Sequence, residues 1–515
     1  MVFARFLRIG TRRLIQRALR VRILALLMFP LLLSVTSIQC PFGGGKQAHG
    51  FTQINRNGFG YIENLVDMND YPWGLQYFQP DGSTTGHIYA STGNGIDDQI
   101  MYQIGALNLP IPPLRPGEVR RYRPEVNSLF WESSLDIREF EQGPTFETTG
   151  FRSLQVYRPP NMSNYLYAGS LSSDCALWRT STGISGDWEK VWSYGDRGSI
   201  RAVAIHNGLL YFAVLPGGEI GDGSPGQVWA HDGVNTWQII DDGFGDITNG
   251  GVWTMSSFNG YLYVSLANVA KGFEVWKLEG KGNKAGPPVR VINHGGSWRG
   301  NFAAATSCVF DDHIYFGTQI LGGINSSGEG PILRGTDLMR LDRDDKLEIV
   351  VGPDSISGIS SGFGKPQNAY VWAMTVHRGQ LYVGTWDQTS IIQYAVDEFP
   401  QSIEQLLAFL SADLGIPGFG GKQRAIDNYV NGVTPPKRAP TFLSGQLDMG
   451  GDMYRTRDGI TWETVFTDGL GNPYNYGARI MLSHDGDLFV GMANLYEGIE
   501  VWKKDRNNEN DSTEE

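Results

Sequence analysis

The chain has 515 residues with 42 basic and 54 acidic side chains, which gives a formal net charge of −12. This acidic balance argues against nucleic acid as a partner, because a phosphate backbone demands a basic surface. Three cysteines are too few for a disulfide scaffold, so the fold must depend on a buried core.

The first 39 residues have the layout of a secretory signal peptide. Residues 1–22 contain seven arginines and no acidic residue, and an apolar run follows from Ile23 to Ile38. That run is shorter than the roughly 20 residues that a membrane span needs. We therefore interpret residues 1–39 as a signal peptide and expect export to the cell envelope or the extracellular space. Without the seven arginines, 35 basic and 54 acidic side chains remain.

Cys40 directly follows this segment. It stands where the acceptor cysteine of a bacterial lipoprotein would stand, so Cys40 is a candidate for lipidation and membrane anchoring. The tripeptide Ser37-Ile38-Gln39 departs from the usual residues before such a cysteine. Ordinary cleavage after Ser37 is therefore the alternative. Residues 40–50 are interpreted as a flexible lead-in.

Residues 51–504 repeat one unit, whose clearest copy is Gly243 to Trp276. This copy contains a Gly-Phe-Gly loop, a first strand over 252–258, an Asn259-Gly260 turn and a second strand over 261–266. A third strand is expected around Trp276 and a fourth before the next glycine loop. Four antiparallel strands per unit without a long helical period predict an all-β propeller. The loop, Gly-Phe/Leu-Gly followed by an asparagine, recurs at Gly58–Asn64, Gly243–Asn249, Gly362–Asn368 and Gly469–Asn475.

Counting the second strand predicts seven blades. The last copy ends at Trp502 without a fourth strand, and the segment Phe51–Ile54 matches the missing one. We expect this N-terminal strand to complete blade seven and close the ring, which removes two open sheet edges. The second strands are His87–Tyr89, Tyr165–Tyr167, Leu209–Tyr211, Tyr261–Tyr263, His313–Tyr315, Gln380–Tyr382 and Asp487–Phe489.

The long insertions all fall between second and third strands. The largest, residues 387–450, belongs to blade six and contains an amphipathic helix pattern that begins at Ser402 and ends at Gly415. In an up-and-down meander, these loops lie at the same end as the loops that precede the first strands. We place the binding site on this loop-decorated face, which the 387–450 insertion would partly cover as a lid. The tail 505–515 is expected to be disordered.

Residues that recur at one position of the unit are interpreted as scaffold. One such position precedes the tight turn on the opposite face, and another lies five residues after the second-strand aromatic. The first is filled by His206, His377 and His484, and the second by Asn94, Asn268, Asp387 and Asn494. The loop asparagines Asn64, Asn249, Asn368 and Asn475 receive the same interpretation.

One position near the start of the first strand varies in a different way. It is filled in turn by Trp73, Arg152, Arg201, Trp253, Ala305, Trp372 and Arg479. Guanidinium groups bind carboxylate or sulfate in bidentate fashion, and indole faces stack on sugar rings. These residues therefore predict a receptor for an anionic ligand, with His294 as an additional candidate. The alternative is that the side chains pack between blades.

The stretch Tyr454–Trp462 resembles the Asp box of sialidase-type (BNR) propellers, although it is one residue short between Asp and Gly. Looser echoes are 231–237 and 180–188. The resemblance implies a structural turn between strands three and four, in a secreted bacterial repeat protein. Sialidases hold a carboxylate with three arginines, but no motif in this chain allows their catalytic Tyr, Glu or Asp to be transferred.

For function, we expect an exported, non-catalytic and monomeric protein that binds a glycan or a protein partner through its decorated face. No phosphate loop, serine elbow, paired-cysteine motif or metal motif occurs in the sequence, and we expect no cofactor or metal. The alternative is an enzyme, a glycoside hydrolase or a polysaccharide lyase, that acts on an acidic polysaccharide.

Overall fold

The structure is a computed structural model that describes residues 45–59, 69–94, 116–141, 147–218, 223–282, 284–320, 334–389, 449–495 and 497–506. The predicted signal peptide, Cys40, the helix pattern after Ser402 and most of the acidic tail lie outside these ranges. Gly45–Glu515 forms one compact unit, and its described part is an all-β structure. Within the described ranges, no helix is long and apolar enough to cross a membrane.

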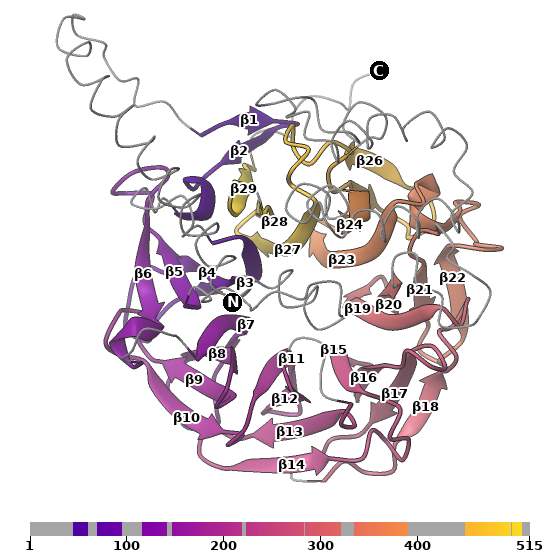
Figure 1. The fold of residues 1–515 in the computed structure, drawn as a ribbon, viewed down its shortest axis with the longest axis horizontal. Helices are drawn as coiled ribbons and strands as arrows, with labels where there is room; N and C mark the ends of the chain where they lie inside the picture. The colour runs from indigo at the N-terminus through magenta and orange to yellow at the C-terminus, as the bar shows by residue number, and fades with distance from the viewer. Residues whose placement is uncertain are drawn as a thin grey trace, which may run out of the picture. The chain divides into compact units, whose positions relative to one another are not determined.

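The strands form successive antiparallel groups that surround a centre (Figure 1). The first strand of each group contacts the first strand of the next group, and β27 contacts β3 in the same way. These strands therefore line the inside of a closed ring, as in a β-propeller. The inner strands are β3 (Tyr71–Phe78), β7 (Thr148–Tyr157), β11 (Gly198–His206), β15 (Gly251–Phe258), β19 (Asn301–Phe310), β23 (Asn368–His377) and β27 (Gly477–His484).

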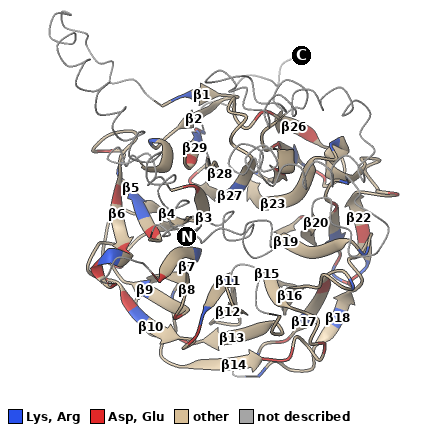
Figure 2. Cartoon of the chain, viewed as in Figure 1, with Lys and Arg blue, Asp and Glu red and all other residues tan. Residues whose placement is uncertain are grey.

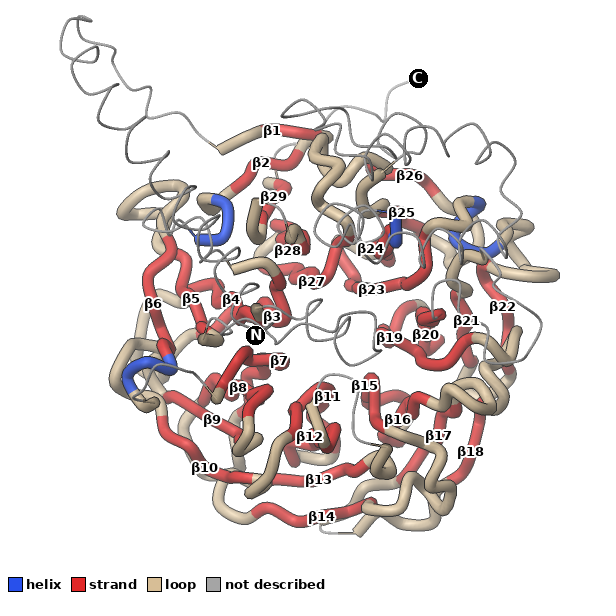
Figure 3. The backbone as a smooth tube through the Cα atoms, in the orientation of Figure 1, coloured by secondary structure: helices blue, strands red, loops and turns tan. Residues whose placement is uncertain are grey.

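Each inner strand pairs with a second strand, and third and fourth strands follow outward (Figure 3). The second strands are β4 (His87–Gly93), β8 (Tyr165–Ser172), β12 (Leu209–Pro216), β16 (Tyr261–Ala267), β20 (His313–Ile320), β24 (Gln380–Asp387) and β28 (Asp487–Ala493). The third strands are β5 (Glu118–Tyr122), β9 (Ala176–Thr180), β13 (Gln227–His231), β17 (Glu274–Leu278), β21 (Leu338–Leu341), β25 (Met453–Thr456) and β29 (Glu500–Lys504). The fourth strands are β6 (Trp131–Asp136), β10 (Glu189–Ser193), β14 (Thr236–Ile240), β18 (Val289–Ile292), β22 (Leu347–Val351) and β26 (Glu463–Phe466).

The last group is completed by the N-terminal part of the chain. β2 (Phe51–Gln53) pairs antiparallel with β29, with Gln53 opposite Trp502. Asn55 then accepts a hydrogen bond from the Val501 amide, 2.6 Å away. A short strand β1 (Gln47–Ala48) adds to the outer edge of β2, within the stretch that the sequence predicts as a flexible lead-in. The predicted closing strand thus occupies its predicted place.

The hydrophobic core lies between adjacent groups. One cluster joins Tyr211 and Val228 of the β11–β14 group to Val252 and Leu262 of the β15–β18 group. The aromatic residue of each second strand is buried, as with Tyr89 and Tyr382, both 0% exposed. Packing two twisted sheets face to face in this way buries the apolar side of each sheet.

The loop motif and the tight turns have the backbone conformations that their residues imply. In the Gly-Phe/Leu-Gly loops, the first two residues are both left-handed, for example Gly243 and Phe244 with φ of 63° each. Phe244 is an unusual residue for this conformation, and its ring stacks on Trp276 with 5.3 Å between centroids. Two of these loops are short 3-10 turns, η1 (Asn57–Phe59) and η3 (Ser361–Gly364), and a third such turn is η2 (Ile137–Glu139).

Candidate binding site at the inner strands

Every inner strand has a β-bulge at the position that the sequence analysis singles out. In β11, for example, the register with β12 shifts between Ile200 and Ala202, so Arg201 is the extra residue. A bulge redirects a side chain away from the regular alternation of the strand. The residues at these bulges, called the bulge ring from here on, are Trp73, Arg152, Arg201, Trp253, Ala305, Trp372 and Arg479.

The structure brings each arginine of the bulge ring onto a tryptophan of an adjacent group. The guanidinium carbon of Arg201 lies 3.9 Å from the ring centroid of Trp253. The other two pairs are Arg152 on Trp73, at 4.9 Å, and Arg479 on Trp372, at 5.2 Å. Cation–π contacts of this kind hold a guanidinium in place without neutralising its charge.

The tryptophans themselves pack between groups. Trp73 is 2% exposed, and its ring would clash with any Cβ added at Gly150 of the next inner strand. Trp372 contacts Gly477 in the same way. The indole nitrogen of Trp253 donates to the side-chain oxygen of Gln319, 2.7 Å away. The indoles therefore have the packing that the scaffold interpretation predicts.

Arg201 and Arg479 are only half-buried, and they interact with each other electrostatically across the ring. Burial, followed by the positive charge of Arg479, lowers the pKa of Arg201 to about 9. Burial also lowers the pKa of Arg479, whose guanidinium lies between Trp372 and Tyr71, 5.8 Å from the Tyr71 centroid. The Nε atom of Arg479 has no hydrogen-bond partner in the described part of the chain. Two guanidinium groups thus share a region of low dielectric.

The inner strands have a distinctive charge. Among the Lys, Arg, Asp and Glu residues of the chain, β7, β11 and β27 contain one arginine each, and β3, β15, β19 and β23 contain none. Figure 2 accordingly colours these strands mostly tan. All the charge on the described inner wall is therefore positive, although the whole chain is acidic.

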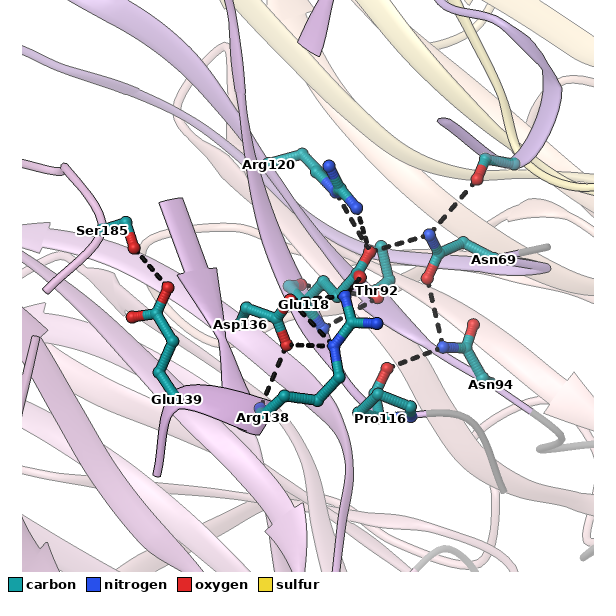
Figure 4. Close-up of polar contacts among 11 residues, drawn as sticks. Asn69, Thr92, Asn94, Pro116, Glu118, Arg120, Asp136, Arg138, Glu139 and Ser185 are labelled. Atoms are coloured by element: carbon teal, nitrogen blue, oxygen red, sulfur yellow. Dashed lines mark hydrogen bonds and ion pairs between the residues drawn. The ribbon is translucent and has the colours of Figure 1, made fainter. Parts of the chain in front are cut away.

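A second polar system lies at the same end of the strands. In the first group, Asn69 donates to the carbonyl of Gly58 and to Glu118, and Asn94 donates to Asn69 (Figure 4). Arg120 also binds Glu118 through its guanidinium group, at 2.9 and 3.0 Å. The sequence analysis assigned the loop asparagine of this group to Asn64, which lies outside the described residues; Asn69 makes the equivalent contacts.

The same bonds recur around the ring, and we call them the asparagine–carboxylate network. In the fourth group, Asn249 donates to the carbonyl of Gly243 and to Glu274, and Asn268 donates to Asn249. The scaffold interpretation of these asparagines agrees with their contacts. The carboxylates, which sequence reasoning passed over although each immediately precedes or begins a third strand, are Glu118, Glu274, Asp337, Asp452 and Glu500.

The sixth group departs from this pattern, because Asp387 replaces the second asparagine. Asp387 is 1% exposed and accepts hydrogen bonds from Thr389. Burial raises the pKa of Asp387 to about 7; Thr389 opposes the shift, Asp452 adds to it and Lys365 opposes it. A carboxyl group that keeps its proton can donate a hydrogen bond, as the asparagine amide does elsewhere.

The histidines occupy the places that the sequence predicts for them. His206 bonds Ser257 and the carbonyl of Glu279, both at 2.8 Å, and His377 bonds Ser483 at 2.9 Å. His484 instead stacks on Tyr77, 3.6 Å between centroids. His294 lies exposed in the loop before β19, with a left-handed φ of 51°, away from the bulge of that strand.

The Asp-box-like stretch forms a hydrogen-bonded turn between β25 and β26. Asp458 accepts from the amides of Ile460 and Thr461, and Thr456 accepts from the amide of Gly459. These bonds lower the pKa of Asp458 to about 2. The turn therefore has a structural role and lies where the resemblance implies.

The two described cysteines, which lie in different groups, are not joined in a disulfide. Cys175 and Cys308 are free thiols, and burial raises the pKa of Cys308 to about 12. Cys175 is buried, and Cys308 is half-buried. Within the described ranges, no cluster of three His, Cys, Asp or Glu side chains could hold a metal ion.

No family model matches the chain, and no curated protein matches it. Among solved structures, it is similar to the WD40 β-propeller domain of Doa1, with a TM-score of 0.42, 9% identity, and coverage of 88% of this chain and 98% of that one. It is also similar to a chain of the mitotic checkpoint complex, with a TM-score of 0.42, 8% identity and coverage of 91% and 98%. A chain from a study of two prolyl endopeptidases is similar with a TM-score of 0.42 and 8% identity. That match covers 86% of this chain and 48% of the other. Likeness at this level concerns the fold alone.

Proposed function

We propose that the chain is an exported, non-catalytic β-propeller that binds an anionic ligand, carried by a glycan or a protein, at the centre of its decorated face. The observation that carries this proposal is the charge of the inner strands, where the charged side chains are the three arginines of the bulge ring. A carboxylate or sulfate that enters between Arg201 and Arg479 would relieve their repulsion and accept charged hydrogen bonds from their guanidinium groups.

The arrangement of the arginines suits capture better than structural support. Arg201 and Arg479 lie against aromatic rings, and the positive charge of Arg479 acts on the pKa of Arg201. The rings orient both guanidinium groups before a ligand arrives, which reduces the entropy that binding costs.

We further propose that the ring has seven blades. The bulge ring supports this count, because the same bulge occurs once in each antiparallel group. The last blade then contains β2, β29, β28 and β27. An experimental structure with six or eight blades, or with β2 unpaired from β29, would overturn this proposal.

A non-catalytic role is supported by the engagement of the buried carboxylates. Glu274, Asp452 and Glu500 accept hydrogen bonds from the loop asparagines and hold the scaffold together. The enzyme alternative requires a free acid or base beside the ligand. Incubation of the purified chain with acidic polysaccharides, followed by assays for new reducing ends and unsaturated products, separates the two. Turnover abolished by Arg201→Met would favour the enzyme.

The binding site is tested by Arg201→Met in the full chain, screened against arrays of carboxylated, sulfated and neutral glycans and acidic peptides. We expect an anionic ligand whose affinity falls by about 1.5–3 kcal/mol in the variant, the usual cost of a lost charged hydrogen bond. Arg299→Met is a matched control, because exposed Arg299 lies in the loop before β19 and bonds the carbonyl of Ala270. Equal losses in both variants, or no anionic ligand, would contradict the proposal.

Export is tested separately by the N-terminus of the protein recovered from cells. We expect cleavage near residue 39, with either a lipid-modified Cys40 or a new terminus after Ser37. Mass spectrometry of the N-terminal peptide distinguishes these two forms. An intact Met1 in the bulk of the protein would contradict export.

A further inference from the structure

The sixth group combines two large aromatic residues at places where no other described group has an aromatic residue at both. Tyr370 stands two residues before the bulge of β23, the position of Gly251 in β15 and Gly477 in β27. Trp386 stands at the end of β24, where β16 has Ala267. The fourth group keeps its shape with Gly251 and Ala267 at these places, so the propeller fold itself does not require the two rings together. The first group also has an aromatic residue at the first place, Tyr71, but it has Gly93 at the second.

The two residues form a stacked pair, which we call the aromatic platform. Tyr370 and Trp386 are opposite each other across the β23–β24 ladder. Their ring centroids are 4.2 Å apart, and their planes are tilted by 24°. Both side chains are half-buried, whereas Trp372 of the bulge ring is only 5% exposed. The platform therefore keeps aromatic surface accessible that a core residue would have buried.

The aromatic platform borders the arginines of the bulge ring. The ring of Trp386 lies 6.0 Å from Trp372, on which Arg479 is stacked. Tyr370 is also 6.0 Å from Trp372 and is close enough to Arg201 to influence its charge state. Accessible ring faces and desolvated cations thus meet at one place, and both come from strands rather than from loops.

We propose that Tyr370 and Trp386 bind the ring of an acidic saccharide whose carboxylate lies between Arg201 and Arg479. This inference rests on the proposed function and names the ligand class. The C–H groups of a pyranose carry partial positive charge and pack on the electron-rich face of an aromatic ring. An acidic peptide would satisfy the arginines but would leave the platform unused.

The test uses the full chain and the probes galacturonate trisaccharide, its neutral galactose counterpart, inorganic sulfate and a hexaglutamate peptide, measured by calorimetry. We expect Trp386→Leu to weaken binding of the galacturonate trisaccharide about tenfold or more, because one stacking surface is lost. Sulfate affinity should stay unchanged in this variant. Trp386→Phe should restore most of the saccharide affinity, since a flat ring remains. Arg201→Met should weaken binding of the galacturonate trisaccharide and of sulfate.

A matched control is Trp192→Leu, because half-buried Trp192 packs on Trp229 in outer strands. This variant should bind the galacturonate trisaccharide as the parent does. If Trp386→Leu lowers the melting temperature strongly, Tyr370→Leu supplies the second variant. The inference is overturned, and the proposed function kept, if sulfate or hexaglutamate binds in an Arg201-dependent way while the galacturonate trisaccharide gains nothing from Trp386. If no anionic probe depends on Arg201, both proposals fail.

Discussion

The asparagine–carboxylate network and the bulge ring lie at the same end of the same strands, yet they are built on opposite principles. In the fourth group they are only four residues apart, at Asn249 just before β15 and Trp253 within it. The network repeats one set of hydrogen bonds, in which each asparagine amide has a carbonyl and a carboxylate as acceptors. The bulge ring repeats a backbone shape but changes its side chains from strand to strand.

We propose that this difference separates stability from recognition. A buried polar group that is fully bonded adds to the uniqueness of the fold, and repeating it gives five of the groups the same anchor. Burying two arginines that repel each other is costly, and we propose that an anionic ligand offsets this cost. The following predictions test whether the two systems are as distinct as their contacts suggest.

The largest effect is expected from Glu274→Ala in the network. Glu274 is 2% exposed and accepts hydrogen bonds from Asn249, Trp276 and Arg290. Its loss leaves these donors without an acceptor, which should lower the free energy of unfolding by about 4 kcal/mol. Urea unfolding measures the change. Glu279→Ala, in the half-exposed turn that follows β17, is the control and should change stability little. Equal losses of stability in the two variants would show that the network does not stabilise the fold.

Asp387→Asn should change how stability depends on pH. Because folded Asp387 keeps its proton to about pH 7 whereas an unfolded Asp releases it near 3.8, the unfolded state binds fewer protons between these values. The free energy of unfolding of the parent should therefore fall as pH rises through this window, by up to about 1.4 kcal/mol per pH unit. Above pH 7 the variant should be the more stable protein.

Urea unfolding at several pH values from 4 to 8 tests this expectation. The groups that face Asp387 are Asp452 and Lys365, and the substitution leaves both in place. The mirror variant Asn268→Asp should introduce a similar pH dependence in the fourth group. A constant difference between the parent and Asp387→Asn over this range would show that Asp387 does not titrate there.

The smallest effect is expected from Arg201→Met without ligand. Relief of the repulsion with Arg479 offsets the lost contact with Trp253, so stability should change by less than about 1 kcal/mol. Arg120→Met should cost about 3 kcal/mol, because it removes the buried one of the two guanidinium groups that bind Glu118, Arg138 being the other. Thermal unfolding of the two variants compares them directly. A large loss for Arg201→Met would make Arg201 part of the scaffold.

Much of this architecture could be predicted from the sequence because the same pattern of strands and turns recurs in each repeat. The turn Asn259-Gly260 has the two positive φ values, 49° and 81°, of a tight hairpin. The equivalence of Arg201 and Trp253 could be predicted by counting from the second-strand aromatics, and both residues lie at bulges. The pairing of β2 with β29 followed from a missing fourth strand in the last copy.

Contacts between residues of distant groups could not be predicted from the sequence. Nothing local shows that Arg201 and Arg479, which belong to distant groups, interact with each other. The insertion before Asn69 also shifted the loop asparagine away from Asn64, because spacing within a loop is not constrained by strand pairing. The platform did leave a signal: aligned on the second-strand aromatics, Trp386 stands against Ala267 of β16 and Ala493 of β28. Comparing repeats for residues that break the pattern would have found it.

The closure of the ring gives the synthesis of the chain a fixed order of events. Strand β2 is made among the first described residues and its partner β29 among the last; the Asn55 side chain donates to the carbonyl of Ile499, 444 residues away. Loop-closure entropy grows only with the logarithm of length, so this long separation adds little to the free-energy cost of pairing the two strands. Until the last strand is released, however, the stacked groups form an open arc with two unpaired edges, which readily add foreign strands. A chain that ends early, before Glu500, would remain such an arc, and only the complete polypeptide can protect its own edges.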